Sequence, residues 1–308
     1  MARTTAMRRK RRCASIFVAR TTGSRRLPMN EAAVLPIVDC HAHVFTRDLP
    51  LTGDAWTAPD YDYTPTDYLA ELDRHGVHFG ILSGLSISGT YNDYTIAAVR
   101  NHRRLRATVL VDPGVDPYSL KRMGEEGVVG VRYQWVRRPV LPDLTDHAHR
   151  VLLRRVRDLD WHVHVAVEGA RIREVLAMLE PSGVKVVLDH FAHPEPAAGA
   201  CCDGLSAALE AVQRGRTWIK LAAGFRLAGP DAWRDEDIAP AERIARDVAA
   251  RLVREAGPDR LLWGSDAPFV GYEGRMSYGR ALTQFASWVP DPADRAAMSR
   301  TALRFYFG

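Results

Sequence analysis

Cysteine is scarce in this sequence, with four residues among 308: Cys13, Cys40, Cys201 and Cys202. They form no CxxC pair with the spacing of a zinc site, and a secreted disulfide framework would need many more. A reducing cytoplasm is therefore the expected compartment. The chain also lacks an apolar run of the roughly 18 or more residues that a membrane-spanning helix needs, so no membrane span is expected.

Acidic residues are absent from residues 1–30, which hold nine of the basic groups. Taking these nine from the 42 Lys and Arg leaves 33 against 37 Asp and Glu, so the remainder carries a net charge of −4 rather than the overall +5. The basic character belongs to the N-terminal stretch, and nucleic-acid binding by the rest of the chain loses its main support.

The basic stretch, residues 1–30, is predicted to be a disordered and dispensable tail. Its Arg-rich, acid-poor composition is also typical of a targeting segment, although its apolar part, residues 13–19, is short for a secretory signal. A third interpretation is a basic arm that contacts nucleic acid or anionic lipid.

From residue 34 onward, short apolar segments alternate with longer amphipathic ones. The apolar segments predict eight strands, at 34–45, 79–86, 106–111, 128–136, 162–168, 185–190, 217–222 and 260–266. Helical spacing predicts helices at 64–77, 93–102, 120–126, 147–159, 170–179, 205–214, 242–256 and 277–288, and a last one at 292–305.

Eight strand–helix units in succession predict a single domain over residues 34–308, a closed (β/α)8 TIM barrel. The alternative is a doubly wound open sheet, which usually has a glycine-rich phosphate turn after its first strand. The first predicted strand here ends in Asp39-Cys40-His41-Ala42-His43, which contains no glycine, and no GxxxxGK[ST] loop occurs. The absence of both signals favours the barrel.

Polar residues gather where the predicted strands end, which is where barrel enzymes place their active sites. His41 and His43 are two residues apart, so on a strand both side chains lie on the same face. His190 and Asp266 stand at the equivalent ends of two other strands. Imidazoles and a carboxylate that converge on one mouth predict a catalytic or metal-binding site.

With these motifs the chain resembles the amidohydrolase superfamily. The stretches VDCHAHVF, VLDHFAHPE and LLWGSDAPF are similar to its amidohydrolase-2 branch, and within that branch to the lactonases of the 2-pyrone-4,6-dicarboxylate group and related lactonases of sugar acids and muconolactones. The resemblance covers residues 36–308. It implies a hydrolase that opens a small lactone, expected to bear a carboxylate, by attack of water on the ring carbonyl.

The resemblance also implies a role for each matching residue. Asp266 matches the general base that activates water, and His41, His43 and His190 match the groups that polarise the scissile carbonyl. The positions that match substrate-binding residues are Arg132 and Arg138 in GVRYQWVRRP, Tyr63, Arg226 in GFRLA, and Ser86. Ala166 and His193 stand where the pyrone lactonases have a tyrosine and an arginine, which implies a different or less acidic substrate.

The resemblance leaves two cofactor states. Many members of the superfamily bind zinc or another divalent ion, whereas the pyrone lactonase type works without metal. A strand-five ligand position falls at Ala166 here, which favours chemistry without a metal; otherwise a single Zn or Mn would have His41, His43, His190 and Asp266 as ligands. The alternatives to a lactonase are a metal-dependent decarboxylase of the same branch and a non-enzymatic, basic-tailed binding protein.

Overall fold

The computed structural model describes residues 37–229, 232 and 237–308. Its eight strands are hydrogen-bonded in sequence order, and every neighbouring pair is parallel. The strands are β1 (Ile37–Ala42), β2 (Val77–Ser83), β3 (Leu105–Val109), β4 (Val128–Gln134), β5 (His162–Ala166), β6 (Lys185–Leu188), β7 (Thr217–Ala222) and β8 (Leu261–Gly264). A parallel bridge between Ala42 and Ala267 joins the first strand to the last, so the sheet closes into the predicted TIM barrel.

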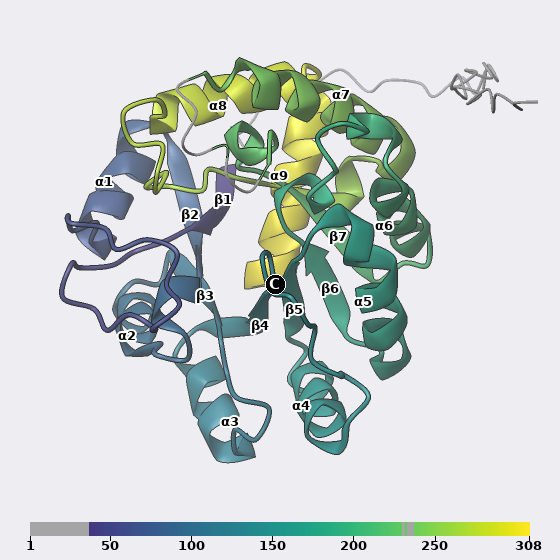
Figure 1. Ribbon diagram of the computed structural model, residues 1–308. Helices are drawn as coiled ribbons and strands as arrows, with labels where there is room; N and C mark the ends of the chain where they lie inside the picture. Colours follow the sequence, from purple (N-terminus) through teal and green to yellow (C-terminus); the bar gives the residue numbers. More distant parts are fainter. Residues whose placement is uncertain (1–36, 230–231, 233–236) are drawn as a thin grey trace, which may run out of the picture. The chain divides into compact units, whose positions relative to one another are not determined.

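Helices surround the strands, as Figure 1 shows. They are α1 (Pro65–Arg74), α2 (Asp93–Asn101), α3 (Pro117–Glu125), α4 (His147–Asp158), α5 (Ile172–Leu179), α6 (Asp203–Gln213), α7 (Ala239–Ala256), α8 (Tyr278–Trp288) and α9 (Pro292–Phe307). Local sequence explains several starts. Thr64 and Asp67 form a reciprocal capping box at α1, and Asp116 and Asp146 cap α3 and α4.

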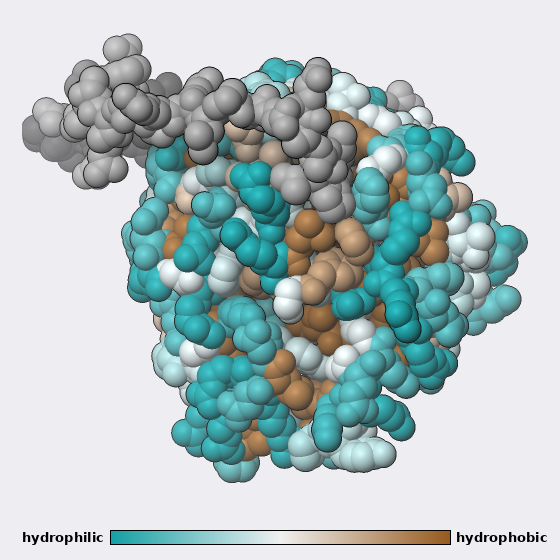
Figure 2. All heavy atoms as spheres, turned by 180° about the vertical axis from the view of Figure 1, so that it is seen from behind, coloured by the Kyte–Doolittle hydropathy of each residue, from teal (hydrophilic) through white to brown (hydrophobic). Residues whose placement is uncertain are grey.

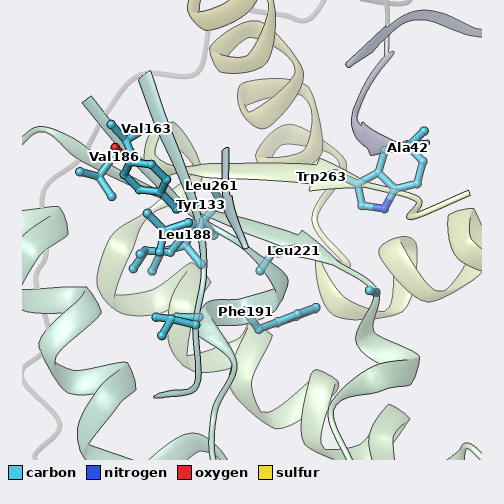
Figure 3. Close-up of a cluster of buried hydrophobic side chains, with 14 of the residues drawn as sticks. Ala42, Tyr133, Val163, Val186, Leu188, Phe191, Leu221, Leu261 and Trp263 are labelled. Carbon is cyan, nitrogen blue, oxygen red and sulfur yellow. The ribbon is translucent and has the colours of Figure 1, made fainter. Parts of the chain in front are cut away.

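The two faces of the strands differ in character. The outward side chains are apolar and pack under the helices; Figure 3 shows Val163 of β5 beside Val186, its register partner on β6. The inward side chains of β4, β5 and β7 include Arg132, His164 and Lys220, all buried. The barrel interior is therefore polar in its middle layer, and such charges are tolerated there only when they are paired.

The C-terminal helix α9 closes the end of the barrel at which the strands begin. Phe305 packs on Trp218 and His162, and Phe307 on Phe79, all near the starts of their strands. In Figure 1 the end of the yellow α9 lies at the centre of the barrel. Polar strand-end residues are thus left at the opposite, open mouth.

The face seen in Figure 2 is mainly hydrophilic, with apolar side chains confined to patches between hydrophilic ones. None of the helices in the described part of the chain is long and apolar enough to cross a membrane. The predicted tail, residues 1–30, lies outside the described residues. Several predicted strands run past the observed ends: 162–168 and 260–266 overrun β5 and β8 by two residues, because the chain stays buried after leaving the sheet.

Candidate active site

Two backbone hydrogen bonds across the seam between β1 and β8 hold the central residues together. The amide of His43 donates to the carbonyl of Ala267 at 2.8 Å, and the amide of Asp266 donates to the carbonyl of His41 at 2.7 Å. The predicted histidine pair and the predicted base are therefore brought side by side by the closure of the barrel.

Asp39 also stabilises the seam between β1 and β8. One of its carboxylate oxygens accepts from the amides of His41 and Ser265, and the other accepts from the hydroxyls of Ser265 and Tyr278. A fully buried carboxylate with four donors is well satisfied, so it fixes the strand ends that carry His41 and Asp266.

The reacting groups lie within contact of one another. The Nε2 atoms of His41 and His43 are 3.3 Å apart, and each lies 3.5–3.6 Å from Oδ1 of Asp266. The other carboxylate oxygen of Asp266 accepts a hydrogen bond from Nε of Arg226 at 2.7 Å. Oδ1 is thus the oxygen that faces the histidines, while Oδ2 is held by the guanidinium.

The backbone adopts the left-handed conformation just after β6, at His190, and just after β8, at Asp266. Asp266 has φ 66° and His190 has φ 46°, a region that non-glycine residues seldom occupy. Strain of this kind gathers at functional sites, where the fold holds a side chain in a required direction. Here it turns the Asp266 and His190 side chains towards the same centre.

Burial and charge fix the ionisation of the central groups. Burial alone would raise the pKa of Asp266, but Arg226 and the neighbouring histidines outweigh it and hold this pKa well below its ordinary value. Burial lowers the pKa of His41 well below its ordinary value, despite the nearby Asp189 carboxylate. Asp266 is therefore a carboxylate at neutral pH and His41 a neutral imidazole.

Hydrogen-bond partners also fix the tautomers of two histidines. Nδ1 of His43 lies 2.8 Å from the carbonyl oxygen of Ser83, and Nδ1 of His190 lies 3.3 Å from that of Ala222. A carbonyl oxygen only accepts, so each Nδ1 carries the hydrogen. In the neutral ring, Nε2 is then an acceptor.

A buried charge cluster supports the centre from inside the barrel. The Asp189 carboxylate contacts His41, His164 and Lys220, and Arg132 approaches it at 3.4 Å. Nζ of Lys220 lies 3.0 Å from Nε2 of His164 and 3.5 Å from Nδ1 of His41. The cluster anchors the His41 ring through charges that compensate one another.

A cavity of about 800 Å³ opens above this centre. Its lining includes His43, His190 and Asp266, so the predicted catalytic groups face it, except His41, which is buried beneath. Four of the five predicted substrate-binding residues also line it: Ser86, Arg132, Arg138 and Arg226 from the loops or ends of β2, β4 and β7.

Tyr63, the fifth, is placed elsewhere. It pairs with Phe45 across an antiparallel bridge and lines a neighbouring hollow of about 400 Å³ with Glu71, His75 and Tyr278. Sequence reasoning missed Glu168, which lines the cavity two residues beyond β5. Its position just after a strand end was the signal that could have found it.

The donor set fits a metal ion in two places. One nitrogen from His41, one from His190 and a carboxylate oxygen of Asp266 lie within 4.8 Å of one another, as do ligand atoms of His41, His164 and Asp189. In the second group the Lys220 ammonium already lies against His164 and Asp189. The first group therefore has the donor set that could hold a divalent metal ion.

The amidohydrolase family model matches residues 38–308, almost the whole described barrel. The chain belongs to the amidohydrolase family. A 4-sulfomuconolactone hydrolase of Rhizobium radiobacter is 28% identical to this amidohydrolase over 279 residues, which cover 88% of this chain and 90% of the relative. A 2-pyrone-4,6-dicarboxylate hydrolase of Comamonas testosteroni is 27% identical over 280 residues, covering 86% and 87%.

Solved structures agree with this family assignment. One from Pseudomonas putida, assigned to the 2-pyrone-4,6-dicarboxylic acid hydrolases, is 33% identical, has a TM-score of 0.79 and covers 89% of this chain and 98% of its own. A 2,6-dihydroxybenzoate decarboxylase from Rhizobium is 16% identical with a TM-score of 0.61, which shows the fold alone. The similarity thus favours the predicted lactonase group over the decarboxylase alternative.

Proposed function

We propose that this amidohydrolase hydrolyses a small lactone that bears a carboxylate, with Asp266 as the general base. The observation that carries the proposal is the Asp266–Arg226 pair at the floor of the cavity. It keeps a carboxylate ionised and aimed at a space lined by further arginines. Similarity to hydrolases of 4-sulfomuconolactone and 2-pyrone-4,6-dicarboxylate supports a lactone as the substrate class.

In the proposed reaction, Oδ1 of Asp266 removes a proton from a water molecule while the water oxygen attacks the lactone carbonyl carbon. The tetrahedral intermediate collapses with cleavage of the bond between the carbonyl carbon and the ring oxygen. The departing ring oxygen takes the proton back from Asp266. Burial lowers the pKa of His190, and the Nε2 acceptor of its neutral ring is placed to hold the second hydrogen of the water.

Guanidinium groups supply donors to the developing oxyanion and to the acid group. Arg226 uses Nε for Asp266 and Nη2 for the carbonyl of Val270, so its Nη1 is left for the lactone oxygen. Arg132 is buried, and its Nε has no hydrogen-bond partner among the described residues. Arg138 is exposed at the cavity rim, where a planar fork can bind a carboxylate in a bidentate way.

The proposed hydrolysis uses the chain's own groups. If a divalent ion binds, His41, His190 and Asp266 would hold it, and it would polarise the carbonyl as a Lewis acid. The charges around the centre favour the metal-free state, because the three cations Lys220, Arg132 and Arg226 already face the two carboxylates Asp189 and Asp266. An additional divalent charge would be repelled there, whereas an anionic substrate would be attracted.

The test of this function is turnover of a carboxylate-bearing lactone by the wild-type protein and by Asp266→Asn. The variant keeps the shape of the side chain but loses the base, so turnover should fall by about 10²–10⁴-fold, the range for losing a general base. Circular dichroism should show an intact fold. Comparable turnover by the variant would remove Asp266 from the mechanism.

The proposed compartment is the reducing cytoplasm. It is supported by the thiols of Cys40 and Cys202, which are buried and form no disulfide. Recovery of the protein in the periplasmic or secreted fraction of its source cells would contradict this placement.

A further inference from the structure

Two polar atoms in the cavity wall have no hydrogen-bond partner within the described part of the chain. They are Oε2 of Glu168, in the loop after β5, and Nε2 of His193, in the loop after β6. Both residues line the cavity. Buried polar atoms are seldom left unpaired, so each of these two atoms points to a group that a ligand supplies.

The two residues share one stretch of wall next to the reaction centre. The amide of Gly169 donates to the carbonyl of His193 at 2.8 Å, and a Cβ on Gly169 would come within 2.5 Å of that oxygen. The loops after β5 and β6 are therefore pressed together. The His193 ring also packs edge-on against the His190 ring, with centroids 5.0 Å apart.

The chemistry of the two atoms selects their ligand. Oε1 of Glu168 accepts from the backbone amide of Arg137 at 2.6 Å, which fixes the carboxylate and leaves Oε2 to accept a hydrogen. Nε2 of His193 is buried and unpaired among the described residues, and it can donate or accept according to the tautomer of the ring. A hydroxyl group suits both residues, because it donates to a carboxylate and can either donate to or accept from an imidazole nitrogen.

Other ligand groups suit this wall less well. A second carboxylate on the substrate would face Glu168 and be repelled. An ammonium group would suit Glu168 alone, but the same cavity contains Arg132, Arg138 and Arg226. A neutral group that can both donate and accept a hydrogen bond therefore fits best between Glu168 and the arginines.

We infer that Glu168 and His193 form a hydroxyl-binding subsite that selects lactones with ring hydroxyls beside the scissile carbonyl and a single acid group. This inference rests on the proposed lactone hydrolysis. It assigns specificity to two residues outside the general base and the arginines.

The experiment compares two lactones that differ only in hydroxyls: 5-oxotetrahydrofuran-2-carboxylate and its 3,4-dihydroxy derivative. The wild type should hydrolyse the dihydroxy lactone with a kcat/KM about tenfold or more above that of the deoxy lactone, as expected for a hydrogen bond to a charged group. Glu168→Gln and His193→Phe should each bring this ratio close to one. Glu195→Gln, which removes a charge from the same cavity lining, should keep the ratio.

The ratio of the two kcat/KM values separates specificity from structural damage. A residue that only holds the loop in place would, when replaced, lower kcat/KM for both lactones by the same factor. A ratio near one in the wild type, or one that neither Glu168→Gln nor His193→Phe reduces, would overturn the subsite. If neither lactone is hydrolysed, the proposed function fails instead. Calorimetric titration with the ring-opened acids then decides the subsite: 2,3,4-trihydroxyglutarate should bind more tightly than 2-hydroxyglutarate, and equal binding would refute it.

Discussion

Arg226 donates from Nε to Oδ2 of Asp266 at 2.7 Å, and this pair sets the ionisation of the proposed base. The guanidinium comes from the short helical turn Gly224–Arg226 after β7, and the carboxylate follows β8. Two neighbouring strand ends thus supply a base and the cation that keeps it charged. The pair leaves Oδ1 facing the histidines and the cavity.

Loss of the Arg226 cation should move the acid limb of the pH profile. Asp266 accepts a proton only when ionised, and its pKa is held well below its ordinary value, so wild-type kcat/KM should show no acid limb from Asp266 between about pH 5 and 8. In Arg226→Gln, burial raises this pKa with less opposition, and the acid limb should shift to higher pH. Arg226→Lys keeps the positive charge, so it should shift the acid limb less than Arg226→Gln does. If the acid limbs of the wild type and of Arg226→Gln coincide, the pair does not set the ionisation of Asp266.

Arg138 should contribute to binding of the substrate acid group rather than to the chemical step. Arg138→Met should raise KM for a carboxylate-bearing lactone by about tenfold or more and change kcat little, because a charge-assisted contact at the rim is made equally in ground and transition states. Steady-state kinetics measures both values. Arg150→Met, on the exposed side of α4, is the control and should change neither; an equal rise in KM with a lactone lacking the carboxylate would argue against this contact.

Lys220, inside the barrel, should contribute to the stability of the fold. Its side chain is fully buried among Asp189, His41 and His164. Lys220→Met leaves the Asp189 charge less compensated, which should lower the free energy of unfolding by about 3–5 kcal/mol in urea titrations. Lys185→Met is the matched control, since Lys185 pairs with the exposed Asp160 and should cost about 1 kcal/mol or less. Similar losses in both variants would show that the cluster is not strongly coupled.

Turnover should survive removal of divalent metal. The cations around Asp189 and Asp266 already compensate these carboxylates, so chelator-treated protein should retain its rate of lactone hydrolysis. Elemental analysis before and after treatment checks that metal is removed. Loss of activity that zinc or manganese restores would instead assign His41, His190 and Asp266 as metal ligands.

The sequence allowed the fold and the centre of the site to be predicted. Eight apolar segments with intervening helical periods predicted the barrel, and the polar residues at their ends predicted His41, His43, His190 and Asp266, which the structure brings together. Local signals suffice here because every parallel strand of a barrel delivers its last residues to the same mouth.

Residues whose place depends on loop conformation could not be predicted. Tyr63 follows a long loop after β1, and nothing in its local sequence indicates that it faces a hollow beside the main cavity. Glu168 and His193 depend on the close approach of two loops at Gly169. The pairing of Arg226 with Asp266 joins residues 40 positions apart and depends on the turns that follow the neighbouring strands β7 and β8.

The most direct test of the central claim is hydrolysis of a carboxylate-bearing lactone in water enriched in oxygen-18, with mass spectrometric analysis of the ring-opened acid. Attack of an Asp266-activated water on the ring carbonyl places the heavy oxygen in the newly formed carboxylate, and Asp266→Asn should release almost no labelled product. Label in the hydroxyl group instead, which means cleavage on the alkyl side of the ring oxygen, or full turnover by the variant, would contradict the proposed mechanism.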